Sequence, residues 1–221
     1  WKDTAVMIKG DAVQSLTMLF LQMWNVSELK KEKFEPYLTT MAKELKPETG
    51  FVLPYGDSPY DHENVGEEVY VHILNHAKKY VHIMTPYLIL DNGMLDTLTR
   101  AAKSGIEVCI IMPHIPDKWY AFAVAKTYYR ELIEAGVNIY EFTPGFVHAK
   151  VFVSDDDTAT VGTVNLDYRS LYLHFECGIF VYDNPVVHKI EKDFRETLKK
   201  SCKVTASDIG NTGIFMRICG R

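Results

Sequence analysis

Two residues whose types and spacing suit catalysis lie two positions apart, His148 and Lys150. In a β-strand, side chains alternate between the two faces, so this pair would point the same way, about 6.6 Å apart along the strand. Lysine neutralises phosphate oxygens as charge develops, and an imidazole, with an unperturbed pKa of about 6.5, can attack phosphorus or move a proton. The pair therefore predicts phosphoryl-transfer chemistry.

Further polar residues downstream complete the candidate site. Asn165 could donate hydrogen bonds to the same phosphate oxygens, and Asp155 is expected to tie the turn that follows the His-Lys strand. Glu176 falls on the strand face opposite Phe175 and Cys177, so it is expected to hold one histidine nitrogen and fix the tautomer. The candidate catalytic residues are His148, Lys150, Asp155 and Glu176, and the candidate phosphate-binding residues are Lys150 and Asn165.

The elements that must position these residues alternate in type from residue 50 onward. Apolar periodicity predicts strands at 50–55, 80–84, 107–112, 137–141, 146–154, 158–163 and 174–182, and helices at 65–79, 93–103, 119–135 and 185–201. Residues 155–157 would close a hairpin. The pattern predicts an α/β fold, a three-layer α-β-α sandwich around a largely parallel mixed sheet.

The composition sets limits on partners. Hydrophobic residues make up 47% and charged residues 24% of the 221 residues, enough for a substantial core. The formal net charge of -5 argues against a broad nucleic-acid footprint, so no nucleic-acid partner is expected. The longest apolar stretch, residues 15–24, is far shorter than the roughly 20 residues that span a bilayer.

Signals for a metal or cofactor are weak. The sequence has neither a Gly-rich Walker loop nor a carboxylate cluster, which disfavours a nucleotide kinase or a two-metal nuclease. His72 and His76 are four apart on an expected helix but lack a third ligand, so a partly buried histidine pair is the better interpretation. No cofactor and no metal are therefore expected.

The full spacing around His148 resembles a known motif. His148-x-Lys150-x4-Asp155-x6-Gly162-Thr163-x-Asn165 is similar to the motif of the phospholipase D superfamily, with threonine where many members carry serine. Segments 85–87, 101–106, 135–137 and 162–170 resemble, in order, the C-terminal half of bacterial cardiolipin synthases. The resemblance covers about residues 1–205 and implies the phospholipase D type of sandwich. His174 departs from the asparagine usual before Phe-Glu, but the glutamate is kept as Glu176.

The resemblance also implies a domain organisation in which the first of two motifs is missing. Residues 1–26 would be the strand and helix that end the preceding repeat, with the strand at 4–9, and residues 27–49 a connector. Residues 50–205 would form the catalytic domain, and 206–221 a tail of unknown structure. A second histidine would come from the missing N-terminal half or from a second copy of the chain.

The activity that the resemblance implies is phosphatidyl transfer. Two phosphatidylglycerol molecules would give cardiolipin and glycerol through a phosphohistidine, with His148 favoured as general acid and base over nucleophile. The partners would be this anionic phospholipid and a membrane surface; the full-length protein is expected at the bacterial cell membrane and this fragment in solution. Two alternatives stay open: a phosphodiesterase acting on phospholipid or nucleic acid, and an inactive phosphate-binding half.

The aromatic-rich segment at 119–135 has two interpretations. It could border a lipid groove or touch a bilayer, or it could be an ordinary core helix. Core packing is favoured because Ala121, Phe122, Ala125, Tyr129, Leu132 and Ile133 fall on one helical face.

Overall fold

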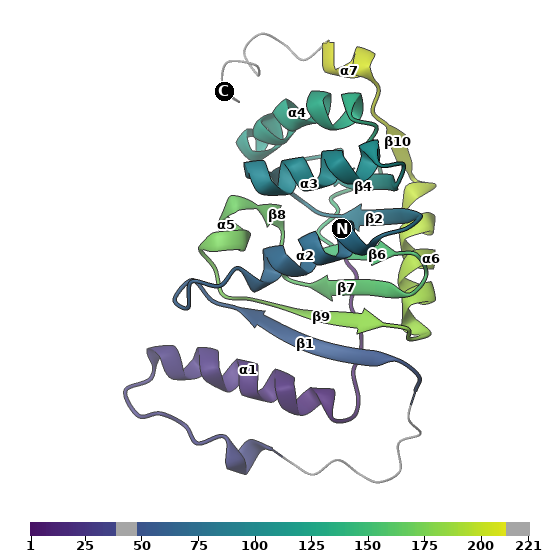
Figure 1. Ribbon diagram of the computed structural model, residues 1–221. Coiled ribbons are helices and arrows are strands. Elements are labelled where there is room, and N and C mark those ends of the chain that lie inside the picture. The colour runs from purple at the N-terminus through teal and green to yellow at the C-terminus, as the bar shows by residue number, and fades with distance from the viewer. Residues whose placement is uncertain (39–47, 211–221) are drawn as a thin grey trace.

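A mixed β-sheet runs through the centre of the molecule (Figure 1). The computed structural model describes residues 1–38 and 48–210. Within these residues the sheet has eight strands, in the order β1 (Phe51–Asp57), β9 (Glu176–Tyr182), β7 (Thr158–Gly162), β6 (Val151–Ser154), β2 (Tyr80–Met84), β4 (Glu107–Pro113), β5 (Asn138–Phe142) and β10 (Ser201–Lys203). Two short strands, β3 (Leu88–Ile89) and β8 (Leu166–Asp167), pair separately.

Strand direction follows from the connections. Two of the seven neighbouring pairs that the described residues form in the main sheet are parallel, β2 with β4 and β4 with β5. The other five are antiparallel. The α/β sandwich with a mixed sheet is confirmed, but the expected predominance of parallel strands is wrong. Helical crossovers join β2, β4 and β5, whereas β6 and β7 follow each other through the predicted hairpin, and a hairpin forces an antiparallel pair.

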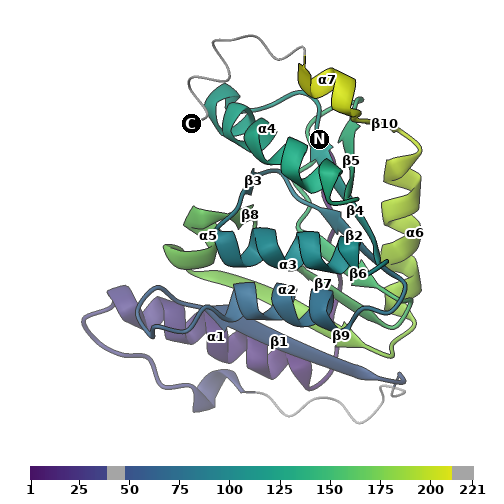
Figure 2. The ribbon, with the colours of Figure 1, turned by 45° about the horizontal axis from the view of Figure 1, so that its top comes forward.

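Helices cover both faces of this sheet (Figures 1 and 2). On one face lie α2 (Val65–His76), α3 (Asn92–Lys103) and α4 (Trp119–Glu134), whose apolar sides share a core cluster with alternate residues of the strands. On the other face α6 (Val186–Leu198) buries Val187, Ile190 and Phe194 in a second cluster. Helix α5 (Tyr168–Tyr172) lies beside β8. The three-layer arrangement is therefore the predicted one.

The N-terminal segment differs from its prediction. The expected strand at 4–9 is wrong, because these residues pair with no strand among the residues that the structure describes. The backbone pairs at Lys2 instead, whose N–H donates to Phe146 O at 2.8 Å and whose carbonyl accepts His148 N–H at 2.7 Å. Val6 and Ile8 pack against the cluster under α6, which explains the alternating pattern in the sequence.

The remaining elements lie at the ends of the described residues. The predicted N-terminal helix is α1 (Ala12–Ser27), which packs along β1 at the edge of the sheet (Figure 1). The connector contains a 3-10 turn, Glu35–Tyr37, and its residues 39–47 lie outside the described part. The predicted tail begins with α7 (Ala206–Gly210), and 211–221 lie outside the described residues. No helix in the described ranges has the length and apolar character that crossing a bilayer requires.

Candidate active site

The candidate catalytic pair, His148 and Lys150, lies just before β6. The strand begins at Val151, later than the predicted 146, but the chain from Val147 onward is already extended, and side chains alternate as expected. Val147 and Ala149 are fully buried in the cluster under α6. His148 and Lys150 therefore point to the other side, at the edge where the parallel strands β2 and β4 end.

His148 is oriented by the N-terminal segment. Its Nδ1 lies 3.1 Å from Oδ2 of Asp3, and its side chain is 38% exposed. The Trp1 ring is 4.9 Å from the imidazole, centroid to centroid. Burial raises the pKa of Asp3, but the hydrogen bonds from His148 and from the Thr4 N–H outweigh it, so this pKa is lowered overall. The carboxylate thus holds Nδ1 and leaves Nε2 for a substrate.

Lys150 is a buried ammonium beside His148. Lys150 is 7% exposed as a whole residue, and its Nζ donates to the carbonyl oxygen of His148. Burial lowers the pKa of Lys150 from 10.5 to about 8, and the negative charges of Asp3, Glu176 and Asp167 oppose that shift. The lysine is therefore charged at neutral pH, and a bound anionic phosphate would offset the cost of burying its ammonium.

Glu176 does not hold His148. It is buried, accepts a hydrogen bond from the Thr163 hydroxyl, and lies 3.6 Å from Nδ1 of His174. Within the described residues, the carboxylate on His148 is Asp3. The expectation that Glu176 would hold a histidine nitrogen thus points to His174, the residue that departs from the family pattern.

Asn165 lies in the loop between β7 and β8 with one polar atom unused. Its Nδ2 donates to Ser170 Oγ at 2.9 Å, while its Oδ1 is buried without a hydrogen-bond partner. The loop is held by Tyr70, whose hydroxyl donates to Val164 O at 2.5 Å. Because the Ser170 hydroxyl can also donate, the amide can turn over and present its NH2 group to a phosphate oxygen.

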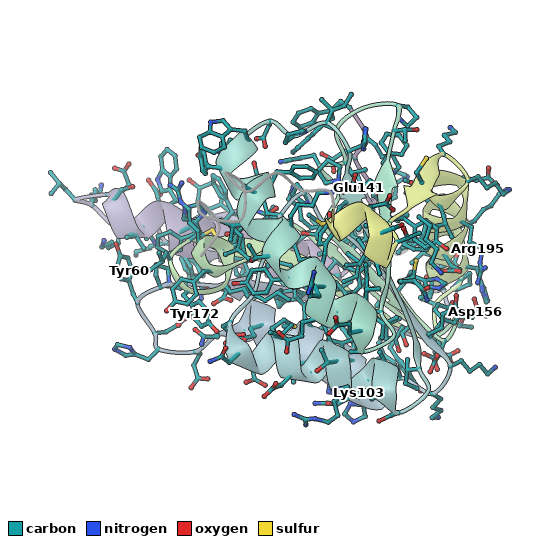
Figure 3. All side chains as sticks on the ribbon, turned by 90° about the horizontal axis from the view of Figure 1, so that it is seen from above. Tyr60, Lys103, Glu141, Asp156, Tyr172 and Arg195 are labelled. Carbon is teal, nitrogen blue, oxygen red and sulfur yellow. The ribbon has the colours of Figure 1, made fainter. Side chains whose placement is uncertain are left out.

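Asp155 lies outside the site. Four strand residues separate it from Lys150, so about 16 Å of extended chain lies between the two. Its carboxylate accepts the N–H groups of Lys78, Lys79 and Tyr80 at 2.6, 3.0 and 3.0 Å. In Figure 3 its neighbour Asp156 lies on the opposite side of the molecule from Tyr172, whose helix α5 follows β8 and the Asn165 loop. These hydrogen bonds support the structural role expected for Asp155 in the turn, and its place among the candidate catalytic residues stays a prediction.

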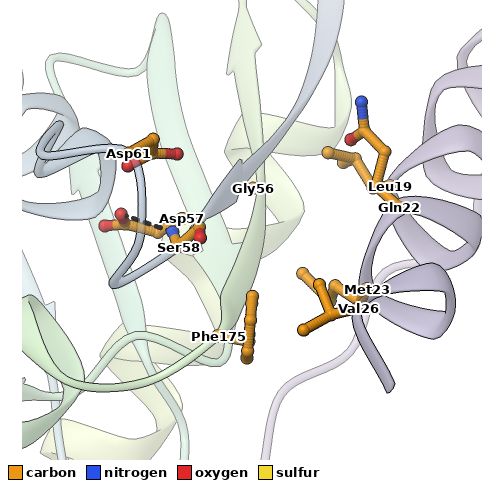
Figure 4. A pocket seen from close by; sticks show the side chains of 9 residues that line it. All are labelled: Leu19, Gln22, Met23, Val26, Gly56, Asp57, Ser58, Asp61 and Phe175. Carbon is orange, nitrogen blue, oxygen red and sulfur yellow. Dashed lines mark hydrogen bonds between the residues drawn. The ribbon is translucent and has the colours of Figure 1, made fainter. Parts of the chain in front are cut away.

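A cleft of about 250 Å³ opens between α1 and the end of β1 (Figure 4). Leu19, Met23 and Val26 of α1 form one wall and Phe175 faces them from the other. The buried Asp57 in this cleft accepts N–H groups from Ser58 and Gly66 at 2.9 and 2.7 Å, which fixes the start of α2. The Asp57 carboxylate in this cleft therefore has a structural role.

No group of three histidine, cysteine, aspartate or glutamate side chains in the described residues is arranged to hold a metal ion. His72 and His76 stack at 4.0 Å between ring centroids on α2. Both residues are exposed, where partial burial was expected, although the His72 ring lies 6.0 Å from the ring of Phe180 on β9, centroid to centroid.

Sequence reasoning missed Asp3 and His174 as site residues. Asp3 lies 145 positions from His148, and no spacing rule joins them. The available signal for Asp3 was its place in the Trp1–Thr4 segment, which resembles the residues that follow the first motif in two-motif relatives. For His174, the signal was that histidine stands where the family pattern has asparagine, two positions before the kept Glu176.

The sandwich and its histidine-lysine edge define a protein of the phospholipase D class. A phospholipase D family member, Nuc from Salmonella typhimurium, superposes with a TM-score of 0.58 at 17% identity, over 69% of this chain and 99% of that chain. Phosphatidylserine synthase of Haemophilus influenzae gives a TM-score of 0.60 at 17% identity, over 76% of this chain and 42% of that one. These likenesses establish the fold.

The family follows from sequence. Residues 70–198 match the family model described as "Cardiolipin synthase, PLD-like domain", and the chain belongs to that family. An uncharacterized protein of Streptococcus mutans is 56% identical over all of this chain and 47% of its own length. Cardiolipin synthase 2 of Bacillus anthracis is 38% identical over 99% of this chain and 42% of its own length. The chain thus spans less than half the length of these relatives.

Proposed function

We propose that this chain supplies one of two catalytic motifs of a phosphatidyltransferase that makes cardiolipin and glycerol from two phosphatidylglycerol molecules. The observation that carries the proposal is the Asp3–His148 contact next to the Lys150 ammonium. Together they offer a proton-transfer group and a cation at one edge of the sheet. The family membership and the relatives named cardiolipin synthase 2 support the substrate class.

In the first step, a second histidine attacks the phosphorus of one phosphatidylglycerol while the bond from phosphorus to the oxygen of its headgroup glycerol breaks. His148, as the imidazolium, gives its Nε2 proton to the departing oxygen, and the negative Asp3 stabilises that imidazolium. In the second step, neutral His148 takes the proton from a hydroxyl of the second phosphatidylglycerol. This hydroxyl attacks phosphorus and the phosphorus–nitrogen bond breaks.

Lys150 and Asn165 act on the phosphate in both steps. The ammonium neutralises the charge that grows on the phosphoryl oxygens, and its desolvation strengthens the interaction. The Asn165 amide donates once it has turned over, with Ser170 as its partner. Glu176, whose negative charge acts on Lys150, positions Thr163 and His174 beside it.

The second histidine comes either from a preceding half of the same polypeptide or from a second copy of this chain. One imidazole cannot be bonded to phosphorus and also protonate the leaving group in the same step. The relatives, more than twice as long as this chain, are consistent with a further half.

The test is phosphatidyl transfer on phosphatidylglycerol vesicles by this chain and by any longer polypeptide that contains it. We expect cardiolipin and glycerol only from an assembly that holds two catalytic histidines, and a loss of about 10²- to 10⁴-fold on His148→Ala, the contribution of a general acid and base. His188→Ala is the matched control, an exposed histidine on α6. If phosphatidic acid forms and cardiolipin does not, the activity is hydrolysis of the phospholipid and the proposed transfer is wrong. Phosphate binding without turnover in any form would leave only a binding domain.

A further inference from the structure

Three large apolar side chains are exposed at the end of β4 and the start of α4. Ile115, Trp119 and Tyr120 are 56%, 61% and 56% exposed. Lys118 stands between them, and together these four residues form what we name the aromatic rim. The Trp119 and Tyr120 rings lie 6.1 Å apart, centroid to centroid, and exposed apolar groups that gather in this way mark interaction sites.

The rim is connected to His148 by a series of aromatic contacts. Lys118 Nζ is 5.7 Å from the centroid of the Tyr87 ring, and the Tyr87 ring is 6.5 Å from that of Phe146. The Phe146 ring in turn is 6.1 Å from the His148 imidazole. The rim and the proposed catalytic histidine therefore lie along the same edge of the sheet.

The residue types of the rim suit one kind of partner. Tryptophan and tyrosine rings are apolar bodies with a polar atom, and they concentrate at the headgroup level of bilayers. Isoleucine reaches toward the acyl chains, while a lysine extends its ammonium back to the phosphates. Asp117 offsets the charge of Lys118, and Tyr87 donates to Asp117 at 2.6 Å, so attraction to anionic lipid is not what the loop provides.

We propose that the aromatic rim inserts into the interfacial layer of a phospholipid bilayer and holds His148 at the level of the headgroups. The inference rests on the proposed function for the identity of the substrate, but docking itself is a separate property. Apolar insertion makes the docking independent of a basic surface, in keeping with the net charge of -5.

Tryptophan fluorescence tests the insertion directly. The Trp1→Phe/Trp24→Phe variant keeps only Trp119, and the Trp1→Phe/Trp119→Phe variant keeps only Trp24, which is 48% exposed on α1 and serves as the matched control. Each is titrated with vesicles of phosphatidylcholine and phosphatidylglycerol, with and without brominated acyl chains. We expect Trp119 emission to move to shorter wavelength and to be quenched by the brominated lipid, and Trp24 emission to stay unchanged.

A second measurement uses the rim variant Ile115→Ser/Trp119→Ala/Tyr120→Ser in the otherwise natural chain. Its partition onto vesicles should fall by about tenfold or more, since each lost side chain removes apolar area from the bilayer. The exposed pair Phe51→Ser/Leu53→Ser on β1 should leave the partition unchanged. Unchanged circular dichroism and unfolding midpoints show that the variants fold.

The outcomes separate docking from catalysis. An unshifted Trp119 in the presence of vesicles overturns the proposal, and so does a Trp119 shift that depends on protein concentration without lipid, which would make the rim an interface between copies. Insertion of Trp119 in this chain, with no phospholipid converted by a dimer of the chain or by a longer polypeptide that contains it, would leave docking standing and contradict the proposed function. Loss of activity on vesicles in the rim variant, with activity on monomeric short-chain phosphatidylglycerol retained, would support both.

Discussion

Asp3 and His148 show how the candidate site depends on a contact between the N-terminal segment and a residue 145 positions away in the sequence. Their carboxylate and imidazole meet at 3.1 Å, and both side chains are partly exposed. Replacing Asp3 by asparagine keeps the shape but removes the charge that stabilises an imidazolium. We expect kcat for phosphatidyl transfer to fall about 10- to 100-fold, less than the roughly 10²- to 10⁴-fold that a general acid and base itself contributes, because water also solvates this pair.

The control is Asp11→Asn, an exposed carboxylate at the start of α1 whose side chain makes no capping hydrogen bond. It loses the same charge in the same segment and should keep full activity. Equal losses from both substitutions would contradict a direct role for Asp3, since the effect would then belong to the net charge.

The lowered pKa of Lys150 predicts that rising pH decreases activity and increases the free energy of unfolding. Burial lowers its pKa from 10.5 to about 8, so the ammonium that phosphate needs is lost as the pH rises past about 8. We expect kcat/KM to fall on that side of the profile. The Lys150→Arg variant, which stays charged, should lack this alkaline limb if it retains activity.

The sign for folding is the reverse. Between about pH 8 and 10.5 the unfolded chain binds the proton of Lys150 and the folded chain does not, so the lysine's contribution to the free energy of unfolding rises with pH. The destabilising effect of the buried ammonium is complete below about pH 8 and absent above 10.5. Urea unfolding of the wild type and of Lys150→Met across this range should show the difference, and parallel curves would contradict a depressed pKa.

At the scale of elements, Asp155 tests whether a motif residue is catalytic or structural. Its carboxylate joins the β6–β7 turn to the start of β2 through three backbone N–H groups. Asp155→Ala leaves these donors with water or with nothing, so we expect a loss of about 1–3 kcal/mol in the free energy of unfolding. At temperatures where the variant is folded, kcat should remain within a few-fold of the wild type.

Chemical unfolding and steady-state kinetics on the same preparation separate the two roles. Asp157→Ala, on the same turn, is the control, because its side chain accepts a hydrogen bond only from Thr158 in the described part of the chain. A stable Asp155→Ala variant that has lost activity would return the residue to the catalytic set.

Elements with a regular period were predictable, and contacts between elements were not. The strand at 80–84 and the start of the helix at 119 agree with the structure to the residue, because buried strands and amphipathic helices have a strong local signal. Ala121, Ala125, Tyr129 and Leu132 are buried as that helical pattern indicated. The segment at 4–9 alternates like a strand, yet pairing depends on a neighbour that sequence does not reveal.

The site divides in the same way. His148 and Lys150 share a side because alternation along an extended chain is local. The carboxylate on His148 is instead chosen by the path of the N-terminal segment, which Lys2 anchors to α6 through Asp193 at 2.7 Å. The prediction for Glu176 left open which histidine it would hold, and the imidazole beside it is that of His174, two positions earlier in the chain.

At the scale of the whole molecule, the decisive quantity is the number of catalytic histidines in one assembly. The candidate site lies at one end of the central strands β6, β2 and β4, and the side chains of His148 and Asp3 are both partly exposed to solvent. A monomer of this chain holds one His148, and the two displacement steps need two imidazoles. We therefore expect the chain to have no measurable transfer activity at dilutions where sedimentation shows only monomer.

Mixing chains then decides where the second histidine comes from. If two copies assemble the site, activity appears as dimers form, and an excess of His148→Ala chains lowers it because mixed dimers hold a single histidine. If a preceding half of the same polypeptide supplies it, activity in a longer chain is unaffected by that excess. Full activity from a monomer of this chain alone would contradict both, since one imidazole would then serve as nucleophile while water or Lys150 supplied the proton.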